Sequence, residues 1–373
     1  MKVVNIDDNF TIYPDSVKTY DCLPAKCYRI EFSKMQGFYL VLHSNLEVKE
    51  KVYGDHKKKV QKILSSFDRI KNRSLGAIAS GKKGIGKSLL FRLLAQEVNK
   101  KGMPVVIVDK YYPGIANYIE SIEQECMVLF DEFDKTFAEL KAGDNASGAQ
   151  TELLGLFDGT AMGKKLFAIT CNDIYKISEF LVNRPGRFLY HFRFEEPDSN
   201  EIIEYMHDKI GFGEWQDRQI SEVVRFSKKV PLNYDCLNAI CFELESGTEF
   251  KEAIQDLNII NTETRYYSIK LYYENGQTAS CASTRINMFG TDKETAYVNL
   301  DNGENLEVIF VSFDIRDAVY MERDNEYVID GEKLHLDYDE CEGSEKLIEK
   351  YKKIKPDRLS IRMQKDKQFH YTV

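Results

Sequence analysis

The chain has 373 residues, a formal net charge of −9, 43% hydrophobic residues and 30% charged residues. This composition is typical of a globular protein and excludes a mainly disordered or fibrous chain, and the length predicts two or three domains. The longest apolar runs are far shorter than the roughly 20 residues that a membrane span needs, so we expect no membrane partner.

The first residues and the cysteines indicate the compartment. The N-terminus, MKVVNIDDNF, has no hydrophobic stretch of the kind that a secretory signal contains. The eight cysteines are scattered, and no second ligand pair accompanies Cys22 and Cys27, so reduced core thiols are expected rather than a zinc site. We therefore expect a cytoplasmic protein, in the host cytoplasm if the source is viral.

Strand and helix patterns divide the first 260 residues into three parts. Residues 27–33 and 36–43 alternate as strands of a hairpin and give an N-terminal β element over 1–48. Apolar residues then recur at helical spacing over 46–71. Short apolar runs separated by helical stretches follow and predict an α/β domain with a parallel sheet over 49–198, and a helical subdomain over 199–260. The predicted strands of that sheet domain are 75–79, 105–109, 127–130 and 166–170, and 89–99 is a predicted helix.

The remainder of the chain, 261–373, is predicted to be a β-rich domain. Three turn signals flanked by strand-like runs predict three hairpins: Asn275-Gly276, Asn302-Gly303 and Asp330-Gly331. Residues 301–345 contain 15 acidic and three basic residues, whereas 346–373 contain nine basic and three acidic ones. We expect an all-β domain followed by a basic terminal tail, which is either a solvated surface or a docking surface.

A phosphate-binding loop stands between the predicted strand 75–79 and the helix that follows it. Gly81 to Ser88 reads GKKGIGKS and fits G-x-x-x-x-G-K-[ST] in the strand-loop-helix context that this motif requires. Glycines let backbone N–H groups surround an anion, and the helix directs its positive end at the phosphates. We expect Lys87 to reach the β- and γ-phosphates of ATP and the Ser88 hydroxyl to hold Mg²⁺. The predicted nucleotide-binding residues here are Gly81, Lys82, Lys83, Gly84, Ile85, Gly86, Lys87, Ser88 and Leu89.

Two carboxylates, Asp131 and Glu132, follow the apolar run 126–130, and Asp131 lies 43 residues after Ser88. Phosphoryl transfer needs charge neutralisation and a positioned water more than covalent chemistry. Asp131 is therefore expected to bind the Mg²⁺ ion, and Glu132 to orient and deprotonate the attacking water.

With these two motifs, the residues of about 50–260 resemble the AAA+ ATPases and, among them, the AAA clade. The resemblance is carried by 153–159 (LLGLFDG), by 166–172 (LFAITCN) and by 183–188 (NRPGRF), in the order typical of the family. It implies that Asn172 is the sensor 1 residue and that Arg184 and Arg187 are arginine fingers that act in the site of a neighbouring subunit. It also implies that Tyr53 and Gly54 contact the adenine, and that 231–235 begins the last lid helix.

Trans-acting fingers imply a homo-oligomeric ring, expected to be a hexamer. The family resemblance favours a chaperone-like hydrolase that converts ATP to ADP and phosphate and remodels, unfolds or disassembles a protein. Tyr112, with Tyr111 as the alternative, is the candidate residue for gripping that substrate, although Tyr-Pro-Gly is equally consistent with a simple turn. A helicase or clamp-loader-like machine is a second possibility, disfavoured by the acidic balance and by the lack of a sensor 2 arginine. An ATP-switched assembly factor is the third.

Overall fold

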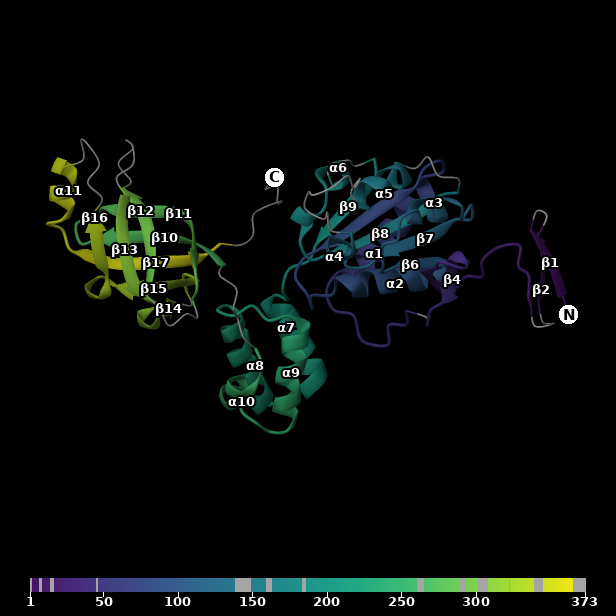
Figure 1. Cartoon of the computed structure of the whole chain (residues 1–373). Helices are drawn as coiled ribbons and strands as arrows, with labels where there is room; N and C mark the ends of the chain where they lie inside the picture. Colours follow the sequence, from purple (N-terminus) through teal and green to yellow (C-terminus); the bar gives the residue numbers. More distant parts are fainter. Residues whose placement is uncertain are drawn as a thin grey trace. The chain divides into compact units, whose positions relative to one another are not determined.

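The computed structural model divides into two compact units, Met1–Leu257 and Asn258–Val373 (Figure 1). Within the part of the chain that it describes, no helix is long and apolar enough to cross a membrane. The described residues are 2–6, 9–13, 17–44, 46–137, 149–158, 163–182, 186–259, 265–288, 293–300, 308–321, 323–338 and 345–364.

The first unit is built on a seven-stranded sheet with the order β4-β3-β6-β7-β8-β5-β9. All neighbouring strands are parallel except β3 and β4, which confirms the predicted parallel sheet. A two-stranded antiparallel ribbon, β1 with β2, precedes it. The bounds are β1 (Lys2–Ile6), β2 (Asn9–Tyr13), β3 (Cys27–Ser33), β4 (Gly37–Leu42), β5 (Leu75–Ser80), β6 (Val105–Val108), β7 (Cys126–Phe130), β8 (Lys165–Cys171) and β9 (Phe188–Arg193).

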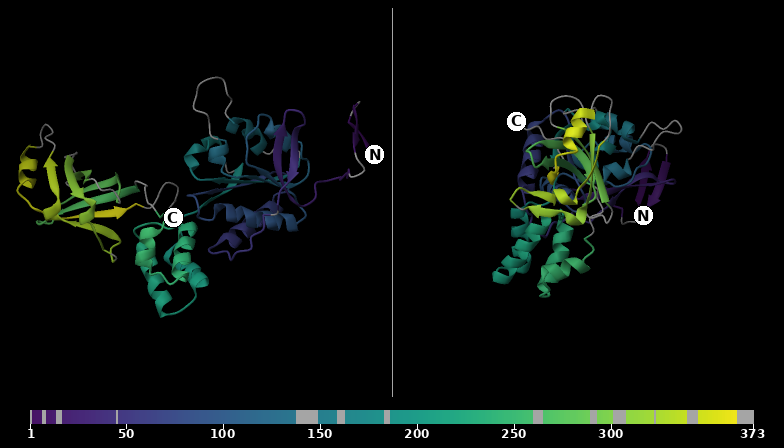
Figure 2. Two further views of the ribbon diagram at one scale, coloured as in Figure 1. Left: turned by 60° about the horizontal axis from the view of Figure 1, so that its bottom comes forward. Right: turned by 90° about the vertical axis from the view of Figure 1, so that its left-hand side faces the viewer.

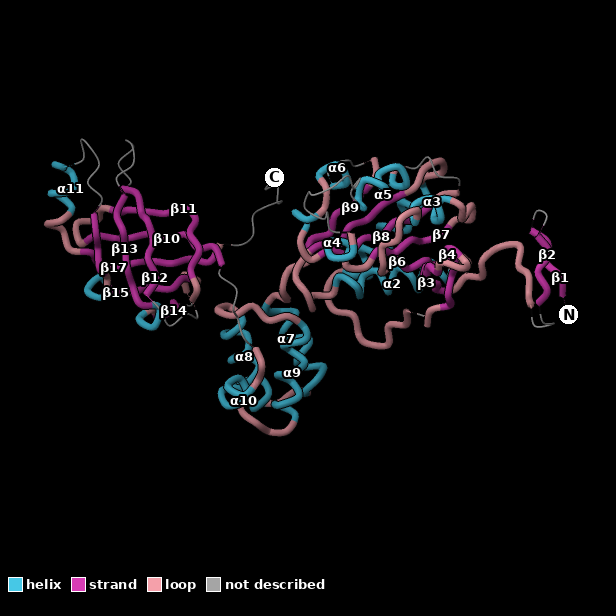
Figure 3. Tube along the Cα trace, in the orientation of Figure 1, coloured by secondary structure: helices cyan, strands magenta, loops and turns pink. Residues whose placement is uncertain are grey.

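Helices cover both faces of this sheet, and each face has its own apolar core (Figure 3). Along β6, Val105 and Ile107 belong to one core and Val106 and Val108 to the other, because side chains alternate between the faces of a sheet. Burial on both faces accounts for the continuous apolar runs of the sequence. One face is covered by α1 (His56–Arg69) and α2 (Lys87–Lys100), and the other by α3 (Ile115–Glu120), α4 (Phe133–Thr136), α5 (Ala149–Phe157) and α6 (Glu179–Val182).

The hairpin β3–β4 extends the nucleotide-binding sheet. Cys27 to Arg29 pair in parallel with Val105 to Ile107 of β6, and Cys27 is fully buried. The sequence analysis places these strands in an element separate from the α/β domain. The structure instead joins them to its sheet, through pairing between segments that lie more than 70 residues apart.

The helical part of the first unit contains four helices, and two of them have side-chain N-caps. Asp198 and Glu201 form a capping box at the start of α7, and Asn233 accepts a hydrogen bond from the Cys236 N–H at the start of α9. The expectation that 231–235 begins the last lid helix is wrong, because α10 follows α9. The helices are α7 (Ser199–Ile210), α8 (Glu214–Ser227), α9 (Tyr234–Glu245) and α10 (Phe250–Asp256).

The second unit is one antiparallel sheet of eight strands, in the order β14-β15-β17-β10-β11-β12-β13-β16, around a single apolar core. Strands β15 and β16 lie near opposite ends of this order, yet only the short turn η3 (Gly331–Lys333) separates them in the chain. The sheet must therefore curl until its two ends approach each other, as the two views in Figure 2 show. The other elements are β10 (Arg265–Tyr273), β11 (Thr278–Ile286), β12 (Lys293–Leu300), β13 (Val308–Asp314), η2 (Ile315–Asp317), β14 (Val319–Met321), β15 (Glu326–Asp330), β16 (His335–Tyr338), α11 (Glu345–Tyr351) and β17 (Pro356–Met363).

Two of the three predicted hairpins are present in this unit. Strands β10 and β11 pair around Asn275-Gly276, and β12 pairs with β13, although Asn302-Gly303 themselves lie outside the described residues. The third prediction is wrong, because Asp330-Gly331 begins η3 and the strands on either side of it do not pair. The predicted basic tail is also partly wrong. Its residues Pro356–Met363 form an interior strand of the sheet, in which Leu359 and Ile361 are fully buried.

Candidate functional site

The loop between β5 and α2 has the close-packed backbone that its glycines predict. Gly81, Gly84 and Gly86 have φ values of +140°, +78° and +93°, which residues with a Cβ rarely adopt. A Cβ on Gly81 would lie 2.3 Å from the Phe194 carbonyl oxygen, and one on Gly86 would lie 2.8 Å from His56 Nε2. Side chains are therefore excluded from this loop, and its backbone can approach an anion at the start of the 14-residue helix α2.

Lys87 lies at the first turn of α2 and is largely buried. Its ammonium group donates a hydrogen bond to the carbonyl oxygen of Lys82, inside the same loop. Burial lowers the pKa of Lys87, and Cys171, Asp134 and Asp131 are among the groups that oppose this effect. The cation is thus held at the loop, where phosphates would be bound.

The predicted acid pair lies beside this loop, at the end of β7. Ser88 Oγ lies 3.4 Å from Asp131 Oδ1. The Thr170 hydroxyl donates to the same Asp131 oxygen at 2.6 Å and accepts from the Glu132 N–H at 2.8 Å. Thr170 was not predicted as a site residue, although it lies in the segment 166–172 that carries the family resemblance. It joins the ends of β7 and β8 and fixes the direction of the Asp131 carboxylate.

Glu132 has a left-handed backbone, with φ +48°, and its half-exposed carboxylate accepts a hydrogen bond from Lys135 at 2.7 Å. The bond to Lys135 lowers the pKa of Glu132, with a smaller contribution from the side chain of Asn172. Glu132 is therefore ionised at neutral pH, as a general base must be.

Asp134 is a buried carboxylate that the sequence analysis missed. Its two oxygens accept hydrogen bonds from the backbone N–H groups of Asn172 and Asp173, both at 3.1 Å. It therefore ties the first turn after the acid pair to the loop that presents Asn172. A signal was present in the sequence, since Asp134 follows Glu132 by two residues.

These oxygens fit a magnesium ion bound to a nucleotide. Mg²⁺ prefers hard oxygen ligands and few protein ones, the rest coming from water and phosphate. The hydroxyl of Ser88 and the carboxylate of Asp131 supply such oxygens beside a loop shaped for phosphates. No cluster of three or more histidine, cysteine, aspartate or glutamate side chains that could hold a metal is found in the described part of the chain.

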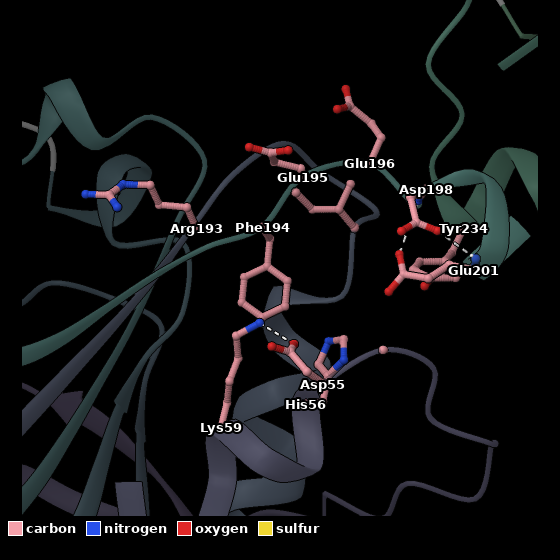
Figure 4. A pocket seen from close by; sticks show the side chains of 12 residues that line it. Asp55, His56, Lys59, Arg193, Phe194, Glu195, Glu196, Asp198, Glu201 and Tyr234 are labelled. Carbon is pink, nitrogen blue, oxygen red and sulfur yellow. Dashed lines mark hydrogen bonds and ion pairs between the residues drawn. The ribbon is translucent and has the colours of Figure 1, made fainter. Parts of the chain in front are cut away.

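A pocket of about 220 Å³ continues from this loop toward the helical part (Figure 4). Ile85 of the loop and Tyr234 of α9 line it, and Lys59 lies against the ring of Phe194, 4.9 Å from its centroid. Basic and acidic side chains line the pocket together, and Asp55 pairs with Lys59. The acidic residues that line it are Asp55, Glu195, Glu196, Asp198 and Glu201.

The segment before α1 is fastened to the loop by His56, another residue that the sequence analysis missed. Its ring nitrogens lie 2.8 Å from the Tyr53 carbonyl oxygen and 3.2 Å from that of Gly86. The ring of Tyr53 packs against Tyr205 and Tyr234, at centroid distances of 5.0 and 6.2 Å. The predicted adenine-contacting residues Tyr53 and Gly54 are thus placed beside the pocket, and Gly54 lines it.

The helical part also contacts the loop directly. The Tyr234 N–H donates to the Gly84 carbonyl oxygen at 3.1 Å, and the side-chain amide of Asn233 donates to the Lys83 carbonyl oxygen at 3.3 Å. A Cβ on Gly84 would lie 2.7 Å from Asp235 Oδ2. A change in the loop conformation on binding a phosphate would therefore alter the hydrogen bonds at the N-terminus of α9.

Comparison with known proteins agrees with this geometry. The family model described as "ATPase family associated with various cellular activities (AAA)" matches residues 77–196, from β5 to the residues after β9. The chain contains an AAA domain. No curated protein matches the chain. Members of the AAA family bind ATP and Mg²⁺, and the AAA domain places the predicted loop, acid pair and Asn172 at one edge of its sheet.

The structure describes one of the two predicted arginine fingers, Arg187. Arg184 lies outside the described residues. Arg187 is buried, and its guanidinium group forms a two-pronged ion pair with Asp158 and donates to the Phe180 carbonyl oxygen at 2.7 Å. Arg187 therefore connects the end of α5 to α6.

The two tyrosines predicted to grip a substrate both contact neighbours within the AAA domain. The Tyr111 hydroxyl donates to Glu152 at 2.8 Å, and the same carboxylate accepts from the Gly114 N–H at 2.8 Å. Tyr112 packs on Phe32 of the hairpin, with ring centroids 5.5 Å apart. The loop is thus held in place, a role that the Tyr-Pro-Gly sequence also predicts.

Proposed function

We propose that the protein hydrolyses ATP within a homo-oligomeric ring, expected to be a hexamer, and uses the energy to remodel a protein partner. The proposal of hydrolysis rests on one observation: Ser88, Asp131, Thr170 and Glu132 are joined at the edge of the sheet beside the phosphate-binding loop. A bound Mg²⁺ ion would neutralise the charge of the phosphates. The chain's own groups supply the rest of the chemistry.

In this proposal Lys87 and the loop N–H groups hold the phosphates, and Ser88 and Asp131 hold the ion. Glu132 accepts a proton from the attacking water through its carboxylate. Asn172, positioned by Asp134, orients that water together with Glu132. Because the loop contacts α9, the loss of a phosphate would alter the helical part and so couple hydrolysis to movement.

We further propose that Arg184 acts on the phosphates of the adjacent subunit, and that Arg187 supports it. The ion pair with Asp158 supports this division of roles, because it engages the Arg187 guanidinium group within its own chain. Arg187 follows Arg184 by three residues in the sequence. A guanidinium group supplied in this way stabilises the charge of the transferring phosphoryl group, with effects of about 10³–10⁵ in rate where it has been measured. A site completed by a neighbour requires an assembly.

Three variants test hydrolysis. Lys87→Ala should lose ATP binding in calorimetry, whereas Glu132→Gln should bind ATP and release no phosphate. Lys100→Ala, at the exposed far end of α2, is the matched control and should behave as the wild type. Equal ATP affinity in Lys87→Ala and the wild type would contradict the assigned site.

Mixed assemblies test the trans role. Arg184→Ala and Lys87→Ala should each be inactive and should partly restore phosphate release when co-assembled, since each supplies the half-site that the other lacks. Asp158→Asn should reproduce the defect of Arg187→Ala if Arg187 acts through Asp158. A lack of recovery in mixed rings, verified by mass measurement, would mean that the site is completed within one chain.

The protein partner is proposed from the family resemblance. Glu132→Gln assembled with ATP should retain such a partner, which mass spectrometry would identify. A helicase-like role predicts instead that single-stranded DNA stimulates phosphate release and that added salt abolishes this stimulation.

A further inference from the structure

One outer face of the second unit carries basic and aromatic side chains together. On β10, Tyr267, Ile269, Leu271 and Tyr273 are at most 2% exposed, so the residues between them point away from the core. Antiparallel pairing places Arg285 of β11 opposite Tyr266, and Arg358 of β17 opposite Tyr272. We call this surface the basic-aromatic face; it comprises Tyr266, Lys270, Tyr272, Arg285, Arg358 and Arg362.

The cations of this face lie over its rings. The guanidinium carbon of Arg358 is 4.4 Å from the centroid of Tyr272, and that of Arg285 is 5.0 Å from the centroid of Tyr266. Arg285 Nε also donates to the Tyr266 hydroxyl at 3.0 Å. Two arginine-tyrosine pairs result, and their tyrosines are about 20 Å apart along β10 at roughly 3.4 Å per residue.

The carboxylates near this face neutralise only part of its charge. Asp357 pairs with Arg358 at 2.8 Å, and Glu326 pairs with Arg362 at 2.7 Å. Among the described residues, no carboxylate forms an ion pair with Lys270 or Arg285, whose cations lie over tyrosine rings instead. Asp330 of β15 also lies opposite Arg358. The positive charge that no ion pair neutralises is therefore that of Lys270 and Arg285, in a chain of net charge −9.

The fold produces this charge separation from the sequence pattern. The acidic stretch 301–345 supplies strands β13 to β16, whereas basic residues of the last stretch enter the sheet as β17, beside β10. The insertion of β17 between β15 and β10 thus gathers Arg358 and Arg362 with Lys270 and Arg285. None of these side chains belongs to the AAA domain.

We propose that the basic-aromatic face binds single-stranded nucleic acid. Cations can contact the phosphates, while unpaired bases stack on tyrosine rings or on the free faces of guanidinium groups. The tyrosine rings and guanidinium groups of the two pairs are planar and can stack on the faces of bases, which a duplex hides and an acidic peptide lacks. This activity goes beyond the proposed ATPase and would bring the ring to proteins assembled on a nucleic acid.

Fluorescence anisotropy of a labelled 20-nucleotide oligo-dT, titrated with the full chain at several salt concentrations, tests the proposal. Lys270→Ala with Arg285→Ala should raise Kd at least tenfold and reduce the salt slope by about 1.4, since each phosphate contact on a single strand contributes about 0.7. Tyr266→Leu with Tyr272→Leu should raise Kd about tenfold and leave the slope unchanged. Arg316→Ala, on the turn after β13, is the basic control and should stay within twofold.

Circular dichroism confirms that each variant is folded, and Lys87→Ala should bind the oligonucleotide as the wild type does. The proposal is overturned if both face variants retain wild-type affinity, or if the wild type fails to bind at low salt. Displacement of oligo-dT by polyglutamate at equal charge, with no effect of the tyrosine substitutions, would also overturn it, and would assign the face to an acidic protein. A loss of binding confined to Lys87→Ala would place the nucleic acid at the AAA domain instead.

Discussion

Asp134 shows how one buried carboxylate can control a catalytic loop without contacting the nucleotide. It accepts hydrogen bonds from the N–H groups of Asn172 and Asp173, and it lies two residues beyond Glu132. The position of Asn172 relative to Glu132 therefore depends on Asp134. Its loss should disturb the water-positioning groups before it disturbs the phosphate-binding loop.

Asp134→Ala is expected to lower kcat at least tenfold and to leave the Kd of ATP within about twofold. Removing hydrogen bonds to a charged group should also destabilise the protein by about 1–3 kcal/mol, measured by urea unfolding. Asp134→Asn, which keeps one acceptor oxygen, should give a smaller loss. An increase in Kd as large as the decrease in kcat would show that Asp134 supports the whole site rather than the Asn172 loop.

Lys135 is expected to set the acid limit of hydrolysis. Its hydrogen bond lowers the pKa of Glu132, and a general base acts only when it is deprotonated, so activity is lost as the pH falls through that pKa. In Lys135→Ala the pKa of Glu132 rises, and the acid limb of the pH profile of kcat should move to higher pH. Lys135→Arg, which keeps the charge, should restore it; an unmoved limb in Lys135→Ala would contradict the pairing.

Residues that belong to a short motif with a known chemistry were predictable, and residues recognisable only by their three-dimensional contacts were not. Lys87, Ser88, Asp131 and Glu132 belong to short motifs whose chemistry can be inferred from spacing. Thr170 and Asp134 act on groups 38 or 39 residues away, and no local pattern shows which strand end they will meet. The ion pair of Arg187 with Asp158 has the same cause, since it forms only when α5 and the loop before β9 are packed.

At the scale of elements, β17 has the largest structural effect, because it is the terminal strand of the second unit and occupies an interior place in its sheet. It pairs with β15 on one side and β10 on the other. A stop codon after Lys355 should therefore unfold the second unit, whereas a stop after Gln364 should leave it folded. Limited proteolysis and near-ultraviolet circular dichroism distinguish the two; equal protease resistance would contradict the central role of β17.

The elements that were mispredicted have physical explanations. The basic side chains of β17 lie on its outer face, so its sequence resembles a solvated tail, although Leu359 and Ile361 are fully buried. Asp330-Gly331 has the composition of a hairpin turn, but the curled sheet uses it to pass from one end of the strand order to the other. In contrast, the parallel strands of the AAA domain were predictable, because burial on both faces gives continuous apolar runs.

At the scale of the whole molecule, the division after Leu257 predicts two units that fold independently. Helix α10 ends at Asp256 and contributes the buried Phe250 and Ala253 to the first unit. A fragment of 1–257 should thus bind ATP with a Kd within about twofold of the full chain, by calorimetry. The fragment 258–373 serves as the matched control and should be folded alone. An insoluble 1–257 fragment would show that the second unit stabilises the first.

The interior position of β17 also bears on how the protein is made. A ribosome delivers β10 and β15 before β17, so the facing edges of β10 and β15 have no partner until β17 has been translated. By then the AAA domain has left the ribosome and can already be folded. A chain released too early would carry a finished ATPase joined to an open sheet with exposed strand edges, which favour aggregation and recognition by chaperones and proteases. Closure of the second unit therefore requires that translation has passed β17.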